Sequence, residues 1–275
     1  MPFTPAHVMA VLPLVRWHRR LRLDPTCLVI GSMSPDFEYF VRGEQVGRIS
    51  HEFVGIAVWC VPMTLILAAL WHHVVKWPVL LAAPSRFARR ITSSFAAPWV
   101  ERWTIAVVVT CVISAAIGAL THILWDGLTH AKGVIVERVP SLTTLYDVPI
   151  LGEKALHRLL QHTSTVVGLV AVAVYLGFAI RRRPPTPEIA VGDPELSRIR
   201  TRTRVVFAAC IAAGLGLMAY RMYRMNIADP GSLIVGTISG ILGGTLVASM
   251  IVRRDARRFR ALASSPPDQA GVASA

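Results

Sequence analysis

The sequence predicts an all-α, polytopic bundle of transmembrane helices, preceded by a short N-terminal helix that does not cross the membrane. Of the 275 residues, 53% are hydrophobic and only 16% are charged, whereas soluble domains carry roughly 25% charged residues. Mean hydropathy is +0.52. Five runs of roughly 17 residues or more lack charged side chains, which is long enough to cross a hydrocarbon core of about 30 Å.

The N-terminal region is predicted to fold over the first spans without crossing the membrane. Thr4 and Pro5 favour a helix start, because a hydroxyl caps a helix and proline suits its first turn; this helix should continue to about Trp17. Glycine and proline in the segment 31–37 predict a turn with Asp36 at its tip. The polar stretch 43–50 is expected to be a loop that leads to the first span. In the same region, Glu38→Gln and Glu44→Gln are expected to be silent if these two carboxylates are merely solvated.

We expect one membrane domain over residues 1–252, followed by a basic, disordered cytoplasmic tail over residues 253–275. Residues 127–161 form the longest predicted loop. The spans are predicted at residues 53–70, 104–124, 164–180, 205–220 and 233–252.

The net charge of +13 could suggest a nucleic-acid partner, but the cations cluster at the ends of the spans. They lie at 181–183, 198–204 and 253–260, which is the positive-inside pattern of cytoplasmic loops. We therefore expect the lipid bilayer as the partner and no nucleic acid, with the C-terminus cytoplasmic and the N-terminal region outside. An even number of spans, as would result if the N-terminal segment entered the bilayer and added a crossing, would invert this orientation. Six cations count against it: Arg16, Arg19, Arg20, Arg22, Arg42 and Arg48.

Histidine and aspartate side chains near the ends of apolar segments form the candidate site. Ionisable groups close to bilayer depth are destabilising unless they pair, coordinate an ion or face water. His122 and Asp126 are four residues apart and share a helix face, which His130 would continue as a ligand or an outer partner. In the predicted topology the whole set lies on the outer membrane face. The candidate metal ligands are His7, Asp36, His51, His122, Asp126 and His130.

Imidazole and carboxylate ligands without a thiolate suit zinc, manganese or iron. We expect a divalent metal, with zinc preferred, as one or two ions. The four cysteines have no paired spacing, and three lie in apolar segments, so they are expected to be core residues.

Four segments together resemble an uncharacterised family of bacterial integral membrane proteins of actinobacterial type, from the start of the chain to about residue 250. They are MPFTPAH (1–7), GSMSPDF (31–37), SH (50–51) and THILWDGLTH (121–130). The order of these ligands is similar to that of membrane-bound metal-dependent hydrolases and, more remotely, of zinc-dependent phospholipases C.

This resemblance implies that Asp36, His51, His122 and Asp126 hold one metal and that His7 and Asp126 contact a second. The phospholipases have a further His-x-x-x-Glu motif. Here His157 is followed four residues later by Gln161, so one or two metals are expected rather than three.

Two functions remain open from the sequence. One is a metal-dependent hydrolase of the bacterial plasma membrane that acts on a phosphoester or carboxylic ester, with a lipid as a candidate substrate because the site lies at headgroup level. The other is a non-catalytic membrane protein in which the same residues form a structural polar network or metal site. A transporter is less favoured, because no span interior carries a charge and no repeat is visible.

Overall fold

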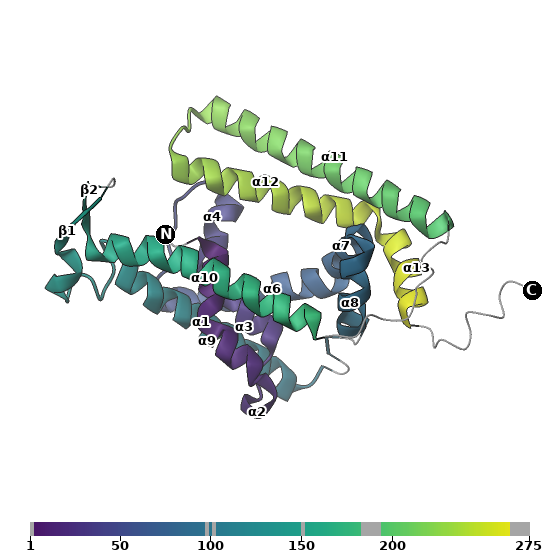
Figure 1. The fold of residues 1–275 in the computed structure, drawn as a ribbon, viewed down its shortest axis with the longest axis horizontal. Helices are drawn as coiled ribbons and strands as arrows, with labels where there is room; N and C mark the ends of the chain where they lie inside the picture. Colours follow the sequence, from purple (N-terminus) through teal and green to yellow (C-terminus); the bar gives the residue numbers. More distant parts are fainter. Residues whose placement is uncertain (1–2, 97–98, 101–102, 150–151, 183–193, 265–275) are drawn as a thin grey trace, which may run out of the picture. The chain divides into compact units, whose positions relative to one another are not determined.

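The computed structural model describes residues 3–96, 99–100, 103–149, 152–182 and 194–264, which are mostly helical (Figure 1). The short 3₁₀ and π-helical elements are η1 (Thr4–His7), η2 (Ser34–Asp36), η3 (Ile56–Cys60), η4 (Trp71–Val75) and η5 (Pro140–Thr143). The α-helices are α1 (Val8–Arg16), α2 (His18–Leu21), α3 (Pro25–Gly31), α4 (Phe37–Arg42), α5 (Phe53–Gly55), α6 (Val61–Leu70), α7 (Lys76–Ala82), α8 (Ser85–Ala96), α9 (Ile105–Thr129), α10 (Leu156–Arg181), α11 (Pro194–Met225), α12 (Pro230–Ile251) and α13 (Arg253–Ser264).

Five of the described helical segments are long and apolar enough to cross a membrane, which confirms the predicted class and count. The chain is therefore a multi-pass membrane protein. Each helix is longer than its predicted span, because backbone hydrogen bonding continues past the polar residue at which a charge-free run ends. The first, for example, passes through His72 and Lys76 before it ends. The five segments are Phe53–Ala82, Ile105–Thr129, Leu156–Arg181, Pro194–Met225 and Pro230–Ile251.

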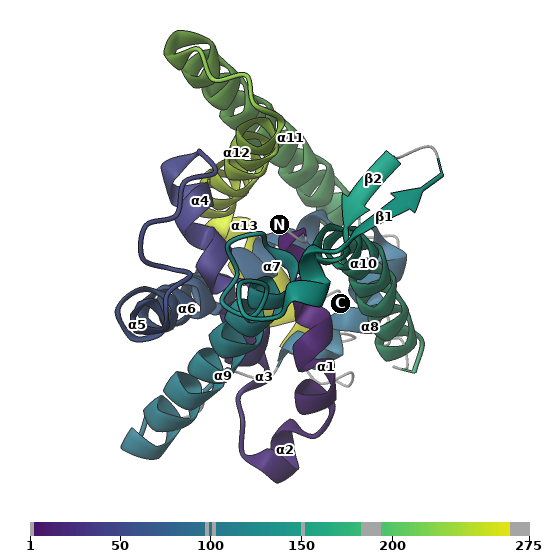
Figure 2. The ribbon, with the colours of Figure 1, turned by 90° about the vertical axis from the view of Figure 1, so that its left-hand side faces the viewer.

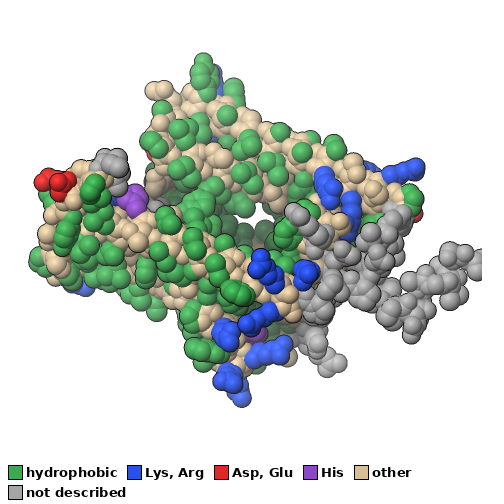
Figure 3. Space-filling model, in the orientation of Figure 1, with side chains coloured by type: hydrophobic (Ala, Val, Ile, Leu, Met, Phe, Trp, Pro, Cys, Tyr) green, Lys and Arg blue, Asp and Glu red, His purple; other side chains and the backbone are tan. Residues whose placement is uncertain are grey.

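Large apolar side chains on these helices are exposed, as expected for surfaces that contact lipid. On α10, Val166, Val170 and Val174 have exposed fractions of 63%, 56% and 50%. Figure 3 shows hydrophobic side chains over the visible face of α10. Such a surface is incompatible with water but fits the hydrocarbon core of a bilayer.

The described chain divides into two compact units. The first contains residues 1–38, 46–68 and 103–177, and the second contains the remainder. The expectation of a single membrane domain over residues 1–252 stays a prediction.

In the first unit, α3 packs closely along α9. A Cβ atom added to Gly31 would lie 2.6 Å from the carbonyl oxygen of Ala115, and one added to Gly118 would lie 2.5 Å from that of Leu28. Small residues at both contacts allow the two backbones to approach, as at the interfaces between membrane helices. This contact positions the chain that follows α3, which includes Asp36.

The loop after α9 contains a short antiparallel hairpin that the sequence did not predict. Strands β1 (Leu145–Val148) and β2 (Gly152–Ala155) pair with Leu145 opposite Ala155. At the start of α10, His157 donates a hydrogen bond from Nδ1 to the carbonyl oxygen of Leu142 at 3.0 Å. This bond ties the loop to the beginning of α10.

The second unit has an apolar core formed by α7, α11 and α13. Its buried members are Trp77, Leu80, Leu81, Leu196, Ala256 and Phe259. The prediction of disorder from residue 253 was wrong for Arg253–Ser264, which forms α13. Ala256 and Phe259 lie on one face of that helix, so burying them in the core stabilises a segment whose composition is otherwise strongly basic. Residues 265–275 of the predicted tail lie outside the described residues.

Candidate metal centre

The long helix α9 supplies the centre of the site through His122 and Asp126. His122 is fully buried, and its Nδ1 lies 2.8 Å from the carbonyl oxygen of Ser32, just after α3. A carbonyl only accepts, so Nδ1 carries the proton, and in the neutral ring that binds a metal the lone pair is on Nε2. This Nε2 lies 3.4 Å from Oδ2 of Asp126 and 3.6 Å from Oδ1 of Asp36.

Asp36 lies at the end of η2, where the tight contact of α3 with α9 brings it beside His122. Its side chain is fully buried, and its Oδ2 accepts a hydrogen bond from the hydroxyl of Thr4 at 2.6 Å. The predicted capping role of Thr4 was wrong, since no side chain caps η1. Burial alone would raise the pKa of Asp36, but His122, His51 and His7 outweigh it and hold that pKa below its usual value.

His51 reaches the site from the loop before the first span. Its Nε2 lies 3.4 Å from Oδ1 of Asp36 and 3.6 Å from Oδ2 of Asp126. The loop itself is held by Glu38, whose carboxylate accepts backbone hydrogen bonds from Arg48, Ile49 and Ser50 at 3.1, 3.3 and 3.0 Å.

The sequence missed this role of Glu38. Glu38 is not merely solvated, because it is 2% exposed, so the condition for a silent Glu38→Gln is not met. Glu44 is half-buried and forms a salt bridge with Arg221 within the second unit. No sequence motif marks Glu38, because its partners are backbone N–H groups, which every residue except proline has.

Four donor atoms converge between Asp36, His51, His122 and Asp126. Each of the two Nε2 atoms faces one oxygen of each carboxylate, and all four separations are 3.4 or 3.6 Å. These distances are long for hydrogen bonds. Four ligands at about 2.0–2.1 Å from a tetrahedral zinc would be roughly 3.3–3.4 Å apart, so these four nitrogen–oxygen separations are close to those that such an ion requires.

A second group of donors surrounds the other oxygen of Asp126. Its Oδ1 lies 3.6 Å from Nε2 of His7 and 3.4 Å from Nδ1 of His130. The ring of His7 stacks on that of His122 with the centroids 3.7 Å apart. The Asp126 carboxylate therefore lies between two sets of imidazoles and could bridge two ions.

His7 has the burial and protonation state expected of a metal ligand. It is 4% exposed, and neither ring nitrogen has a hydrogen-bond partner among the described residues. A buried polar group without a partner is destabilising by roughly 1–3 kcal/mol. Burial, with a smaller contribution from His122, lowers the pKa of His7 to about 3, so the ring is neutral at pH 7 and can donate a lone pair.

His130 lies just beyond the end of α9 and contacts Asp126 in a different way. Its Nδ1 is 3.1 Å from the backbone carbonyl oxygen of Asp126, which requires a proton on Nδ1. The lone pair is then on Nε2, which is buried without a partner among the described residues. Burial lowers the pKa of His130. This geometry fits an outer partner of Asp126 better than a ligand through Nδ1.

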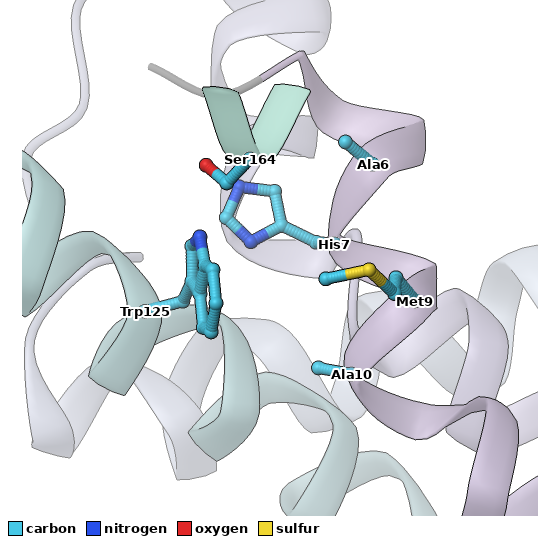
Figure 4. Close-up of a pocket in the computed structure, with 6 residues that line it drawn as sticks. All are labelled: Ala6, His7, Met9, Ala10, Trp125 and Ser164. Carbon is cyan, nitrogen blue, oxygen red and sulfur yellow. The ribbon is translucent and has the colours of Figure 1, made fainter. Parts of the chain in front are cut away.

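A small pocket lies beside His7 (Figure 4). The imidazole of His7 and the indole of Trp125 border it from η1 and α9. Most of the remaining lining is apolar. Its lining residues are Ala6, His7, Met9, Ala10, Trp125 and Ser164.

Comparison with known proteins assigns the family. The family model described as "Domain of unknown function (DUF4184)" matches residues 1–250. The chain belongs to this family. No curated protein and no solved structure matches the chain. The DUF4184 match includes all six candidate ligands, but its description names no activity, so the chemistry has to be argued from the site.

Among its described residues, the DUF4184 chain has a further group of possible ligands, in which one donor atom each of Asp24, Cys27 and Cys111 lie within 4.8 Å of one another. Asp24 already caps α3, because its Oδ1 accepts a hydrogen bond from the backbone nitrogen of Cys27 at 2.7 Å. Both cysteines are buried, in agreement with the expectation that they are core residues.

Proposed function

We propose that this protein is a membrane-bound metal-dependent hydrolase that cleaves a phosphoester or a carboxylic ester. The convergence of two imidazole nitrogens and two carboxylate oxygens at 3.4–3.6 Å carries the proposal. Without an ion, this arrangement would leave Nε2 of His122 and Oδ1 of Asp36 buried without hydrogen-bond partners among the described residues. A divalent cation, with zinc preferred, would satisfy both.

Asp36, His51, His122 and Asp126 would hold the first ion, and His7 with the other oxygen of Asp126 would contact a second. Ions so held act as Lewis acids that polarise an ester or phosphoryl oxygen and acidify water. Neighbouring residues of the chain hold these ligands in place, and one side of the site stays accessible. The His51 and His130 side chains are 26% and 30% exposed, so a substrate would approach past these two residues.

A lipid is the substrate class that fits the surroundings best. Asp126 lies near the end of a helix long and apolar enough to cross a membrane, which supports a site at headgroup level, where ester and phosphoester bonds of lipids lie. We further propose that this is a bacterial protein of actinobacterial type and that it lies in the plasma membrane, with the C-terminus cytoplasmic and the site on the outer face.

The alternative is a non-catalytic role in which the same cluster is a structural metal site or polar network. The burial of His7 and Asp36 favours it, because these residues fasten the N-terminal segment to α9. Metal sites that combine carboxylate ligands with an open coordination position suit catalysis better than closed structural sites do. The partial exposure of His51 and His130 therefore places the hydrolase first.

The test combines metal content, stability and activity of detergent-purified protein. Wild type should contain about one or two equivalents of metal, and a chelator should lower its melting temperature until metal is restored, because a ligand of the native state stabilises it by mass action. Asp36→Asn and Asp126→Asn should insert normally, lose metal and reduce hydrolysis by roughly a hundredfold or more. His162→Ala is the matched control, since this histidine is exposed and is not one of the candidate ligands.

Two results would contradict the proposal. If wild type contains no metal and its melting temperature does not change with chelator or with added zinc, the protein has no metal centre. A metal-loaded wild type that is inert on phospholipids, phosphomonoesters and carboxylic esters, with misfolded aspartate variants, would establish the structural role instead.

A further inference from the structure

The N-terminal helices form a hairpin that runs along α9 and back. The chain leaves the metal centre at His7 through α1, turns at α2, and returns through α3 to Ser32 beside His122. In Figures 1 and 2, α2 is the turn of this hairpin and lies at the bottom of both views. The hairpin is part of the first unit, as is α9.

Contacts between α3 and α9 show how far this hairpin extends from the metal centre. The backbone nitrogen of Asp24 donates to Oγ of Ser114 at 2.8 Å, and Ser114 precedes Asp126 by twelve residues. At about 1.5 Å per residue this is roughly 18 Å along the helix. The donor atoms of Cys27 and Cys111 lie within 4.8 Å of each other, at a level roughly 22 Å from Asp126.

The turn itself therefore lies toward the opposite face of the membrane. The hydrocarbon core is about 30 Å thick, and α2 precedes Asp24 in the chain, at the end of the hairpin far from the metal centre. Long arginine side chains extend a few ångströms further toward the interface. The hairpin does not emerge as a span, so it leaves the number of crossings, and hence the predicted orientation, unchanged.

The turn carries a dense positive charge. Arg16, Arg19, Arg20 and Arg22 are all exposed, and Figure 3 shows basic side chains gathered around α2. Among the ion pairs of the described residues, none involves these four guanidinium groups. Trp17 and Leu21 on the same turn are 50% and 47% exposed. A cluster of arginines with an exposed indole is the composition that favours a membrane–water interface with anionic lipids.

We propose that α1 to α3 form a re-entrant hairpin whose Arg16, Arg19, Arg20 and Arg22 bind anionic phospholipid headgroups on the membrane face opposite the metal centre. In the predicted orientation this face is the cytoplasmic one. Four of the six cations that counted against that orientation then lie on the side that the positive-inside rule requires. Charge complementarity identifies the occupant, because phospholipid phosphates are the anions present at that depth.

The first arm of the test places the turn relative to the membrane. A single reactive cysteine is introduced as Arg19→Cys or as Lys132→Cys, which is exposed in the loop after α9, in a Cys210→Ala background. The other native cysteines are buried. An impermeant maleimide should label Lys132→Cys from one side of sealed cells or vesicles and Arg19→Cys only from the other. Labelling of both positions from the same side overturns the proposal.

The second arm measures lipid binding by detergent-purified protein titrated with short-chain phosphatidylglycerol and, separately, phosphatidylcholine. Wild type should bind the anionic lipid more tightly, and added salt should reduce this preference. The double variant Arg19→Gln with Arg20→Gln should weaken phosphatidylglycerol binding by about thirtyfold, at about fivefold for each charge removed.

Two further variants distinguish headgroup binding from a folding defect. Arg19→Lys with Arg20→Lys keeps both charges and should retain most of the binding. Lys132→Gln with Arg138→Gln removes two exposed charges from the loop after α9 and should leave the lipid preference unchanged. Equal loss in this control pair and in the glutamine variant of the turn overturns the proposal, as does the absence of any preference for phosphatidylglycerol in wild type.

Discussion

Two of the proposed ligands at the metal centre, His122 and Asp36, are each oriented by a second group that the sequence did not mark. The carbonyl oxygen of Ser32 fixes the tautomer of His122, and the hydroxyl of Thr4 fixes one oxygen of Asp36. The candidate ligands themselves could be predicted, because histidine and aspartate are unusual beside apolar segments. Their supports could not be, because a backbone carbonyl and a common hydroxyl have no distinctive sequence signature.

Glu38→Gln tests the support of His51 at the level of a single residue. The amide keeps the shape of the carboxylate but removes its charge and one of two acceptor oxygens, while three backbone N–H groups point at them. Each buried donor left unpaired is destabilising by roughly 1–3 kcal/mol. We expect a lower melting temperature and metal affinity reduced about 10- to 100-fold, as for other residues that orient ligands.

Metal titration and thermal unfolding of Glu38→Gln and Glu137→Gln measure this effect. Glu137 is exposed in the loop after α9, so its variant should match wild type. If the Glu38 variant also matched wild type, the loop before the first span would hold His51 without this carboxylate.

At the scale of secondary-structure elements, hydropathy found the spans but not the elements that approach the site. The match of five predicted spans to five apolar helices follows from length and composition, which a bilayer constrains strongly. The parallel packing of α3 on α9 depends on Gly31 and Gly118 facing backbone atoms 2.5–2.6 Å from where a Cβ would stand. Residues 87 positions apart meet there, and one sequence carries no signal for such a pairing.

Gly118→Ala should disturb the metal centre from a distance. The added Cβ would lie 2.5 Å from the carbonyl oxygen of Leu28 and 2.7 Å from the backbone nitrogen of Ser32. Backbone atoms cannot rotate away as a side chain can, so α3 must move outward and carry Ser32 away from His122. We expect lower thermal stability together with lower metal occupancy, although alanine is intrinsically the better helix former by about 0.8–1 kcal/mol.

Gly177→Ala is the matched control, because a Cβ there has no described atom within 4 Å. This variant should be as stable as wild type or slightly more stable. Metal analysis and melting curves of both variants are the measurements. A Gly118 variant with full metal content would show that the approach of α3 does not govern the position of Ser32.

At the scale of the whole molecule, the arginine clusters predict which side of the membrane each loop occupies. The clusters at 181–183, 198–204 and 253–260 all follow or precede spans on one side under the positive-inside rule. The fold class and the number of spans could be predicted from composition. Orientation depends instead on comparing the number of cations in the loops on the two sides of the membrane, and the N-terminal arginines made that comparison ambiguous. The hairpin of α1 to α3 offers a physical reason, because residues close to the site in sequence can lie far from it in depth.

Reporter fusions test this orientation directly. A reporter placed after Ala275 should be active only in its cytoplasmic form, and one inserted near Asp147 only in its exterior form, because an odd number of crossings separates them. Asp147 lies in β1 on the loop after α9, at the same end of that helix as His122 and Asp126. An exterior signal at Asp147 therefore places the metal centre on the outer face, where the substrate would be an outer-leaflet or extracellular ester. A cytoplasmic signal at Asp147 with an exterior signal after Ala275 would invert the protein and move the site to the inner face, and equal signals at both positions would contradict the five-span topology itself.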